Sequence, residues 1–176
     1  MHPRPAPTPV PARGLTLVEL MIVVVIVGIA AALAVPLFSD TDDVKLRAAA
    51  TVLAADLDAA RIESIAHADD PRVVVFNTVT ETYHVAAASA PTTPLPNPGG
   101  GGSWLITFGQ GAAVSLTGVG LHAVSVGGDD TLAYAAFGHL DESADAAIEL
   151  EAGGMRIVIT VDAATGEATV GTLLTP

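Results

Sequence analysis

One long apolar run constrains this chain more than any other feature. Residues 15–38 read LTLVELMIVVVIVGIAAALAVPLF, and Glu19 is the only charged residue among them. As an α-helix the run would be about 36 Å long at 1.5 Å per residue. That length is enough to cross a hydrocarbon core of roughly 30 Å. We therefore expect a transmembrane helix over residues 15–38.

The segment before this run predicts its orientation. Residues 1–13, MHPRPAPTPVPAR, contain five prolines and two arginines, which indicates a non-helical, positively charged leader. After the run, the next basic residue is Lys45. Because basic residues are retained on the cytoplasmic side of a membrane segment, we expect the leader in the cytoplasm and the rest of the chain outside.

Two simpler interpretations of the N-terminus leave Glu19 unexplained. An ordinary secretory signal peptide also has a basic start, and Ala32-Leu33-Ala34 would supply its cleavage site. However, a charge four residues into the apolar run weakens the core of such a peptide, and the helical pattern continues past Ala34. A plain membrane anchor needs the apolar run but gives Glu19 no purpose.

A carboxylate inside lipid is costly, by at least about 2.5–3.5 kcal/mol on insertion scales. If a peptidase cut between Gly14 and Leu15, the new α-amine would lie four residues before Glu19. With an ordinary pKa of about 7.7–8.0, that amine is largely cationic at neutral pH. Glu19 would then pair with the amine of its own chain or with that of a neighbouring subunit. The second pairing would set a one-step stagger between subunits.

The sequence Arg13-Gly14-Leu15-Thr16-Leu17-Val18-Glu19-Leu20 resembles the class III signal sequence of type IV prepilins and pseudopilins. The resemblance implies that a prepilin peptidase cuts after Gly14 and N-methylates Leu15, a position that is usually Phe in the family. It also assigns an assembly role to Glu19, five residues after the cut, and a helix bend to Pro36. Residues 1–14 would be the leader peptide.

The segment that follows predicts a second, amphipathic helix over about residues 43–66. Apolar residues recur there at spacings of three and four and form one face; they are Leu46, Ala50, Leu53, Leu57 and Ala60. We expect this face to lie against a sheet. Pro71 ends the pattern, because the residue before a proline is pushed out of helical geometry.

Beyond residue 71 the pattern changes to short β-branched runs separated by turns, which predicts an antiparallel sheet over residues 72–174. The expected strands cover residues 72–76, 80–85, 104–108, 112–116, 121–126, 132–137, 146–150, 155–161 and 168–173. The proline- and glycine-rich residues 90–102 predict a surface loop without packed structure. The fold class is therefore α+β, with an extracytoplasmic domain over residues 39–176. The pilin resemblance implies a long N-terminal helix packed on this sheet.

Several stretches of the domain are similar to the H-type minor pseudopilins and their FimT-like pilin relatives. They are residues 59–65, 103–108, 137–140, 148–150 and the terminal 155–171. This resemblance implies a structural subunit at the tip of a type II secretion pseudopilus, with other pseudopilins, the prepilin peptidase and secreted cargo as partners. The location would be the inner membrane, in a single pass. The alternatives are a minor type IV pilin for pilus biogenesis, adhesion or DNA uptake and, more distantly, a membrane-anchored enzyme or binding domain.

Charge and residue types argue against other functions. The net charge of −12 disfavours binding to a phosphate backbone, so no nucleic-acid partner is expected. The absence of cysteine excludes disulfides and thiolate metal sites, and the five histidines lack metal-ligand spacing. Acidic pairs such as Asp141-Glu142 occur in loop-like segments, so we interpret them as solvated surface residues and not as acid–base catalysts. We expect no catalytic residue, no metal site and no cofactor.

Overall fold

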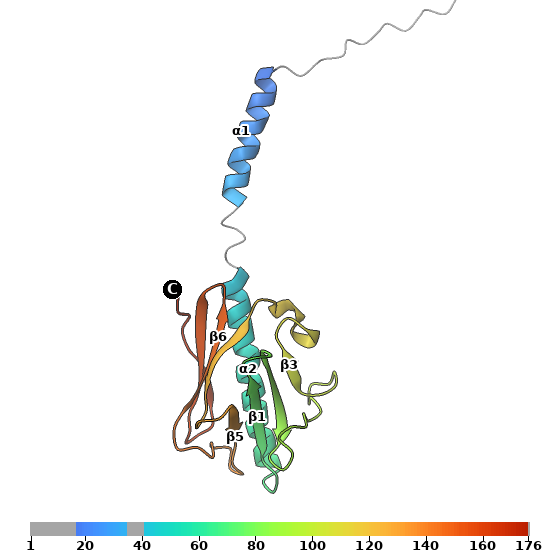
Figure 1. The fold of residues 1–176 in the computed structure, drawn as a ribbon, viewed down its shortest axis with the longest axis vertical. Helices are drawn as coiled ribbons and strands as arrows, with labels where there is room; N and C mark the ends of the chain where they lie inside the picture. The colour runs from blue at the N-terminus through green and yellow to red at the C-terminus, as the bar shows by residue number, and fades with distance from the viewer. Residues whose placement is uncertain (1–16, 35–40, 176) are drawn as a thin grey trace, which may run out of the picture. The chain divides into compact units, whose positions relative to one another are not determined.

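The structure, a computed structural model, describes residues 17–34 and 41–175, with side chains described over 17–29 and 41–175 (Figure 1). The chain divides into two compact units, Met1–Ser39 and Asp40–Pro176. The first unit contributes helix α1, and the second contributes helix α2 and all of the strands described below.

Helix α1 spans Leu17–Ala34 and is apolar on every side. Leu, Ile and Val dominate it, and their branched aliphatic side chains give it no polar face. Glu19 lies in the first turn, where backbone N–H groups favour a negative charge.

Helix α2 spans Thr41–Ala66. Asp42 and Asp43 lie in its first turn, and Arg47 Nε donates to Asp43 Oδ1 at 2.6 Å, the i,i+4 order that suits the helix dipole. One face is buried, as the spacing predicts; its residues are Leu46, Ala49, Ala50, Leu53, Leu57, Ala60 and Ser64. Each fully buried leucine contributes roughly 1.5–3 kcal/mol of transfer free energy.

Two four-stranded antiparallel sheets pack on α2. The first has the order β3-β2-β1-β5, with β1 Arg72–Asn77, β2 Thr82–Ala87, β3 Leu105–Thr107 and β5 Thr131–Ala133. The second has the order β4-β6-β7-β8, with β4 Gly120–Ser125, β6 Ala146–Ala152, β7 Met155–Val161 and β8 Ala168–Val170. Figure 1 shows β1 and β6 flanking α2. The architecture is α+β, as expected, and is consistent with a pilin-like fold.

Alternation along the strands places one face of each sheet in the core. In β6 every second residue is buried, and Ile148 pairs with Ile159 of β7 while Leu150 pairs with Ile157. These four side chains are fully buried and pack with the apolar face of α2 in one hydrophobic cluster. The period-2 pattern therefore selects the face that α2 covers.

The strand expected at residues 112–116 is wrong: Gly111–Leu116 forms a short 3₁₀ helix, η2. Its buried residues, Ala113 and Leu116, are three apart, which matches the 3₁₀ repeat and not the alternation of a strand. The strand expected at 132–137 is also too long. β5 ends at Ala133 because the chain then enters a tight loop, in which Gly138 N donates to Ala135 O at 2.9 Å.

The loop expected at residues 90–102 is more ordered than its composition predicts. Leu95 N donates to Val85 O at 2.8 Å, and Trp104 N donates to Leu95 O at 2.6 Å, so this part of the loop hydrogen-bonds to β2. Leu95 is also half-buried against the core. The prolines interrupt regular pairing here but do not prevent packing.

Candidate functional site

Of the four residues assigned to the N-terminal site, only Glu19 belongs to the described part of the chain. It lies in the first turn of α1. The cleavage and methylation positions, Gly14 and Leu15, and the expected bend at Pro36 lie outside the described residues. Their assignments therefore remain predictions from the sequence.

The described side chains of α1 expose apolar surface in every direction. The exposed fraction is 75% for Leu17, 60% for Met21 and 57% for Ile29, and the large apolar residues between them are exposed to a similar degree. Leaving such side chains in water costs roughly 1.5–3 kcal/mol each relative to burial. The helix therefore needs apolar surroundings, which lipid or other apolar helices can supply.

A shallow apolar groove runs along α1. It is lined by Val18, Met21, Ile22, Val25 and Ile26. Their spacing of three and four residues is the one that lets a second helix pack its side chains into the groove. Glu19 follows Val18 in the sequence and lies in the first turn of the same helix. One helix thus carries both an apolar packing seam and an acidic group at its start.

Within residues 17–34 and 41–175, no helix meets the length and hydropathy required to cross a bilayer.

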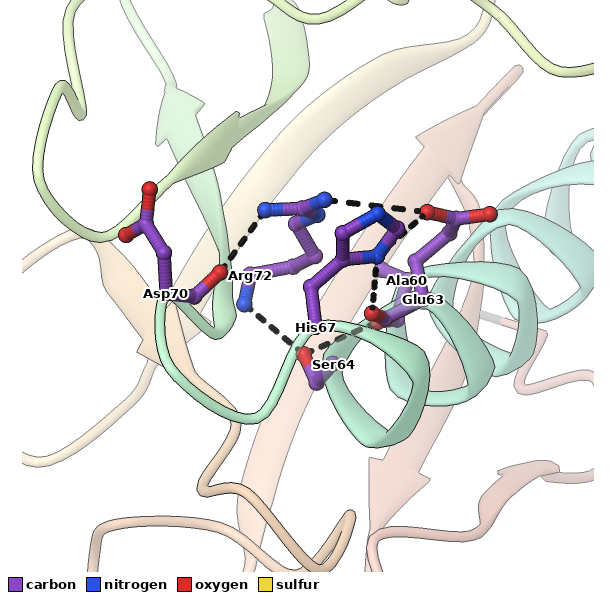
Figure 2. Close-up of polar contacts among 6 residues, drawn as sticks. All are labelled: Ala60, Glu63, Ser64, His67, Asp70 and Arg72. Carbon is purple, nitrogen blue, oxygen red and sulfur yellow. Dashed lines mark hydrogen bonds and ion pairs between the residues drawn. The ribbon is translucent and has the colours of Figure 1, made fainter.

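A second polar cluster joins the C-terminal end of α2 to the start of β1 (Figure 2). Arg72 is 7% exposed, its Nη1 donates to Asp70 O at 2.7 Å, and its Nη2 lies 3.8 Å from Glu63 Oε2. Ser64 Oγ accepts from Arg72 N at 2.8 Å and donates to Ala60 O at 3.0 Å. The sequence patterns did not predict this cluster. The sign available in the sequence was that a serine and an arginine occupy positions where the pattern places buried residues.

The contacts of this cluster are structural in character. The Ser64 hydroxyl is fully buried and engaged with backbone groups on both sides, so it is not presented as a nucleophile. His67 Nδ1 lies 3.2 Å from Glu63 Oε2 on the helix surface. Hydrogen bonds from the Ser89 hydroxyl and backbone N–H lower the pKa of the Asp70 carboxyl. The cluster closes the turn between α2 and β1.

Asp56 makes a polar contact between α2 and β2 of the first sheet. The buried Tyr83 hydroxyl of β2 donates to Asp56 Oδ2 at 2.6 Å. Burial raises the pKa of Asp56, and the hydrogen bond from Tyr83 opposes that shift. Burial likewise raises the pKa of Tyr83 well above its ordinary value. This pair ties the helix to the sheet through one polar contact in an apolar layer.

A polar pocket lies where the β1–β2 turn approaches β4. It has a volume of about 230 Å³, and its lining includes Glu81, His122 and Glu151. His122 is the extra residue of a β-bulge in β4, and its Nδ1 lies 3.0 Å from Glu151 Oε2. Among the described residues no group of three His, Cys, Asp or Glu side chains is placed to hold a metal ion.

The comparisons with known proteins agree with the N-terminal feature. Residues 11–35 match the family model described as the prokaryotic N-terminal methylation motif. The chain therefore carries a type IV pilin-like prepilin signal, joined to an α+β unit consistent with a pilin-like fold. This motif implies processing by a prepilin peptidase and pilin-type partners in general. No curated protein and no solved structure matches the chain.

Proposed function

We propose that this chain is a minor pseudopilin, a structural subunit that initiates or caps the short pseudopilus of a type II secretion system. The observation that carries the proposal is the methylation motif at residues 11–35, which includes a helix that is apolar on every side and has Glu19 in its first turn. The resemblance of several stretches of the domain to H-type minor pseudopilins supports the assignment to a minor subunit. A structural role, without enzymatic activity, is part of the proposal.

In this proposal, a prepilin peptidase removes residues 1–14 and methylates the amine of Leu15. Residues 15–38 then anchor the subunit in the inner membrane in a single pass, with residues 39–176 on the extracytoplasmic side. During assembly the same helix leaves the lipid and packs against the helices of other subunits. Both environments are apolar, so the transfer leaves the burial of α1 nearly unchanged.

Glu19 supplies the register of assembly. Its carboxylate pairs with the methylated amine of Leu15 on the neighbouring subunit, because both charges resist leaving water and each neutralises the other inside the filament. A one-step stagger between subunits satisfies both groups at once. The apolar stripe of α1 supplies the surface on which the staggered helices of neighbouring subunits pack.

Mass spectrometry of the mature protein from its own cells tests the proposal. We expect an N-terminal peptide that begins at Leu15 and carries one added methyl group. A mature chain that keeps residues 1–14, or one that begins at Val35 after cleavage at Ala34, would overturn it. The first outcome points to a plain anchor and the second to an ordinary signal peptide.

A further inference from the structure

Phe137 is a large aromatic side chain that the fold leaves in water. It lies in the loop after β5, at the end of the second unit where α2 terminates, and 85% of its surface is exposed. An exposed large apolar side chain carries information when the backbone that presents it is well ordered. The loop around Phe137 is held on three sides.

Hydrogen bonds close the loop at its base. Ala135 N donates to His139 O at 2.8 Å, and Gly138 N donates to Ala135 O at 2.9 Å. From α2, Arg61 Nε donates to Gly138 O at 3.2 Å. The backbone on both sides of Phe137 is therefore paired within the loop and tied to the helix.

Two glycines let neighbouring elements approach this loop closely. Gly138 has a φ of +81°, and a Cβ there would lie 2.8 Å from Ile65 Cδ1 of α2. On the other side, a Cβ on Gly166 of the β7–β8 turn would overlap Gly138 O. The loop is thus packed between α2 and the turn. Phe137 remains outside this packing although its neighbours are inside it.

The loop that carries Phe137 packs beside exposed apolar residues of α2. Ile62 is 64% exposed and Ile65 is 49% exposed, three residues apart on the same helix face. Ile65 contacts Gly138, the residue next to Phe137. We call Ile62, Ile65 and Phe137 the Phe137 patch. A preorganised aromatic beside aliphatic neighbours is typical of the anchor of a protein–protein interface, because little side-chain entropy is lost on binding.

Acidic residues are frequent on the elements that meet the loop. Asp141 N donates to Ala133 O at the base of the loop, and Leu140 N donates to Ala163 O of the β7–β8 turn. Ala163 N in turn donates to Asp145 Oδ1 at 2.8 Å. The other carboxylates on these segments and on the adjoining turn of α2 are Asp58, Asp141, Asp162 and Glu167. Arg61 is the base that contacts the loop, and the whole chain carries a net charge of −12.

This charge selects the occupant of the patch. Anionic lipid surfaces and nucleic acids are repelled, and a second copy of the chain would bring the same carboxylates to the contact. We propose that the Phe137 patch docks a different protein chain, whose contact face has an apolar pocket with a rim of lysine or arginine. The aromatic anchor provides the affinity, and the acidic residues on the elements that meet the loop provide the choice of partner.

Photo-cross-linking of the full-length protein in its own cells tests this proposal. A photoreactive phenylalanine analogue replaces Phe137 in one variant and Val79 in the matched control. Val79 is 91% exposed in the β1–β2 turn, at the opposite end of β1 from the loop. We expect an adduct with a different protein at position 137, at least tenfold above that at position 79. Its cross-linked peptide should be apolar and flanked by lysine or arginine.

A charge variant provides the second readout. Asp141→Asn combined with Glu167→Gln, on the loop and on the β7–β8 turn that packs against it, should lower the yield of the position-137 adduct at least threefold. An adduct between two copies of this chain, an adduct with lipid, or a yield no higher than at position 79 would overturn the proposal. A yield unaffected by the charge variant would also overturn it, because the partner would then lack the basic rim. These outcomes do not depend on processing at Gly14.

Discussion

At the scale of single residues, Glu19 and Asp56 show how the surroundings of a carboxylate decide its effect. Glu19 is placed at the start of an apolar helix, where the first-turn N–H groups favour its charge. Asp56 is placed between α2 and the first sheet, where burial disfavours its charge and the Tyr83 hydroxyl offsets part of that cost. The first carboxylate is the one to which the proposed function assigns a role in assembly, and the second links α2 to β2 within the fold.

Replacing Glu19 by Ala or Gln should leave membrane insertion intact and reduce incorporation into filaments at least tenfold. Both variants remove the charge, but Gln keeps the shape, so equal defects would identify the charge as the cause. The measurement is the amount of this chain in membrane and sheared-filament fractions. Val23→Ala, which leaves Glu19 in place and lies outside the apolar stripe, is the control. Normal incorporation of Glu19→Ala would contradict the pairing rule.

Asp56→Asn should change the stability of the second unit in a pH-dependent way. Because the pKa of Asp56 is raised in the folded state, its contribution to stability is complete below the ordinary value of 3.8 and is lost as pH rises through the folded pKa. The stability of the variant relative to that of the parent should therefore be higher at pH 7 than at pH 3.5. Thermal unfolding of the full-length protein in detergent measures the difference.

Asp70→Asn is the control of opposite sign. Hydrogen bonds from Ser89 lower the pKa of Asp70, so its contribution is present above 3.8 and is lost as pH falls through the folded pKa. The stability of this variant relative to that of the parent should be lower at pH 7 than at more acidic pH. If both variants shifted in the same direction, the environments assigned to the two carboxylates would be wrong.

At the scale of elements, the two helices differ in what covers them. The described side chains of α1 are apolar on all sides and exposed, whereas α2 buries one stripe against two sheets and keeps its polar side in water. The difference follows from composition, since α2 alternates apolar and charged residues at helical spacing. A helix of the first kind depends on other apolar molecules, and one of the second kind on its own domain.

Leu53→Ala should destabilise the second unit by about 2–5 kcal/mol, because Leu53 is fully buried between α2 and the sheets. Val44→Ala on the same helix should change the stability by less than about 0.5 kcal/mol, since Val44 is 65% exposed. Denaturant unfolding of both full-length variants in detergent provides the measurement. Similar losses for the two would contradict the buried face assigned to α2.

At the scale of the whole molecule, the prepilin signal and the α+β unit serve different purposes. The signal is matched over residues 11–35 and implies processing by a prepilin peptidase, whereas the second unit, under the proposed function, would present the surface that contacts particular partners. A minor pseudopilin and a minor type IV pilin share the first part. Only the partners of the second part separate them.

Deletion of the gene should reduce secretion of type II substrates more than tenfold and leave surface pili unchanged. Secreted-protein activity and electron microscopy of sheared pili measure the two effects. Complementation with the full chain should restore secretion, and the Glu19→Ala chain should not. Lost pili with normal secretion would instead assign the chain to a type IV pilus.

Local sequence was sufficient to predict α1, the apolar face of α2 and most strands, because each depends on the period of apolar residues over a short window. The Gly14, Leu15 and Glu19 assignments have the same local origin and stay predictions where the structure does not describe them. The tertiary structure decided the order of the two sheets, the 3₁₀ turn at η2, the burial of Arg72 on Ser64 and the exposure of Phe137. The order of the sheets and the loop that presents Phe137 depend on residues distant in the sequence, such as Val73 with Ala133 or Arg61 with Gly138, whose contacts no local pattern encodes.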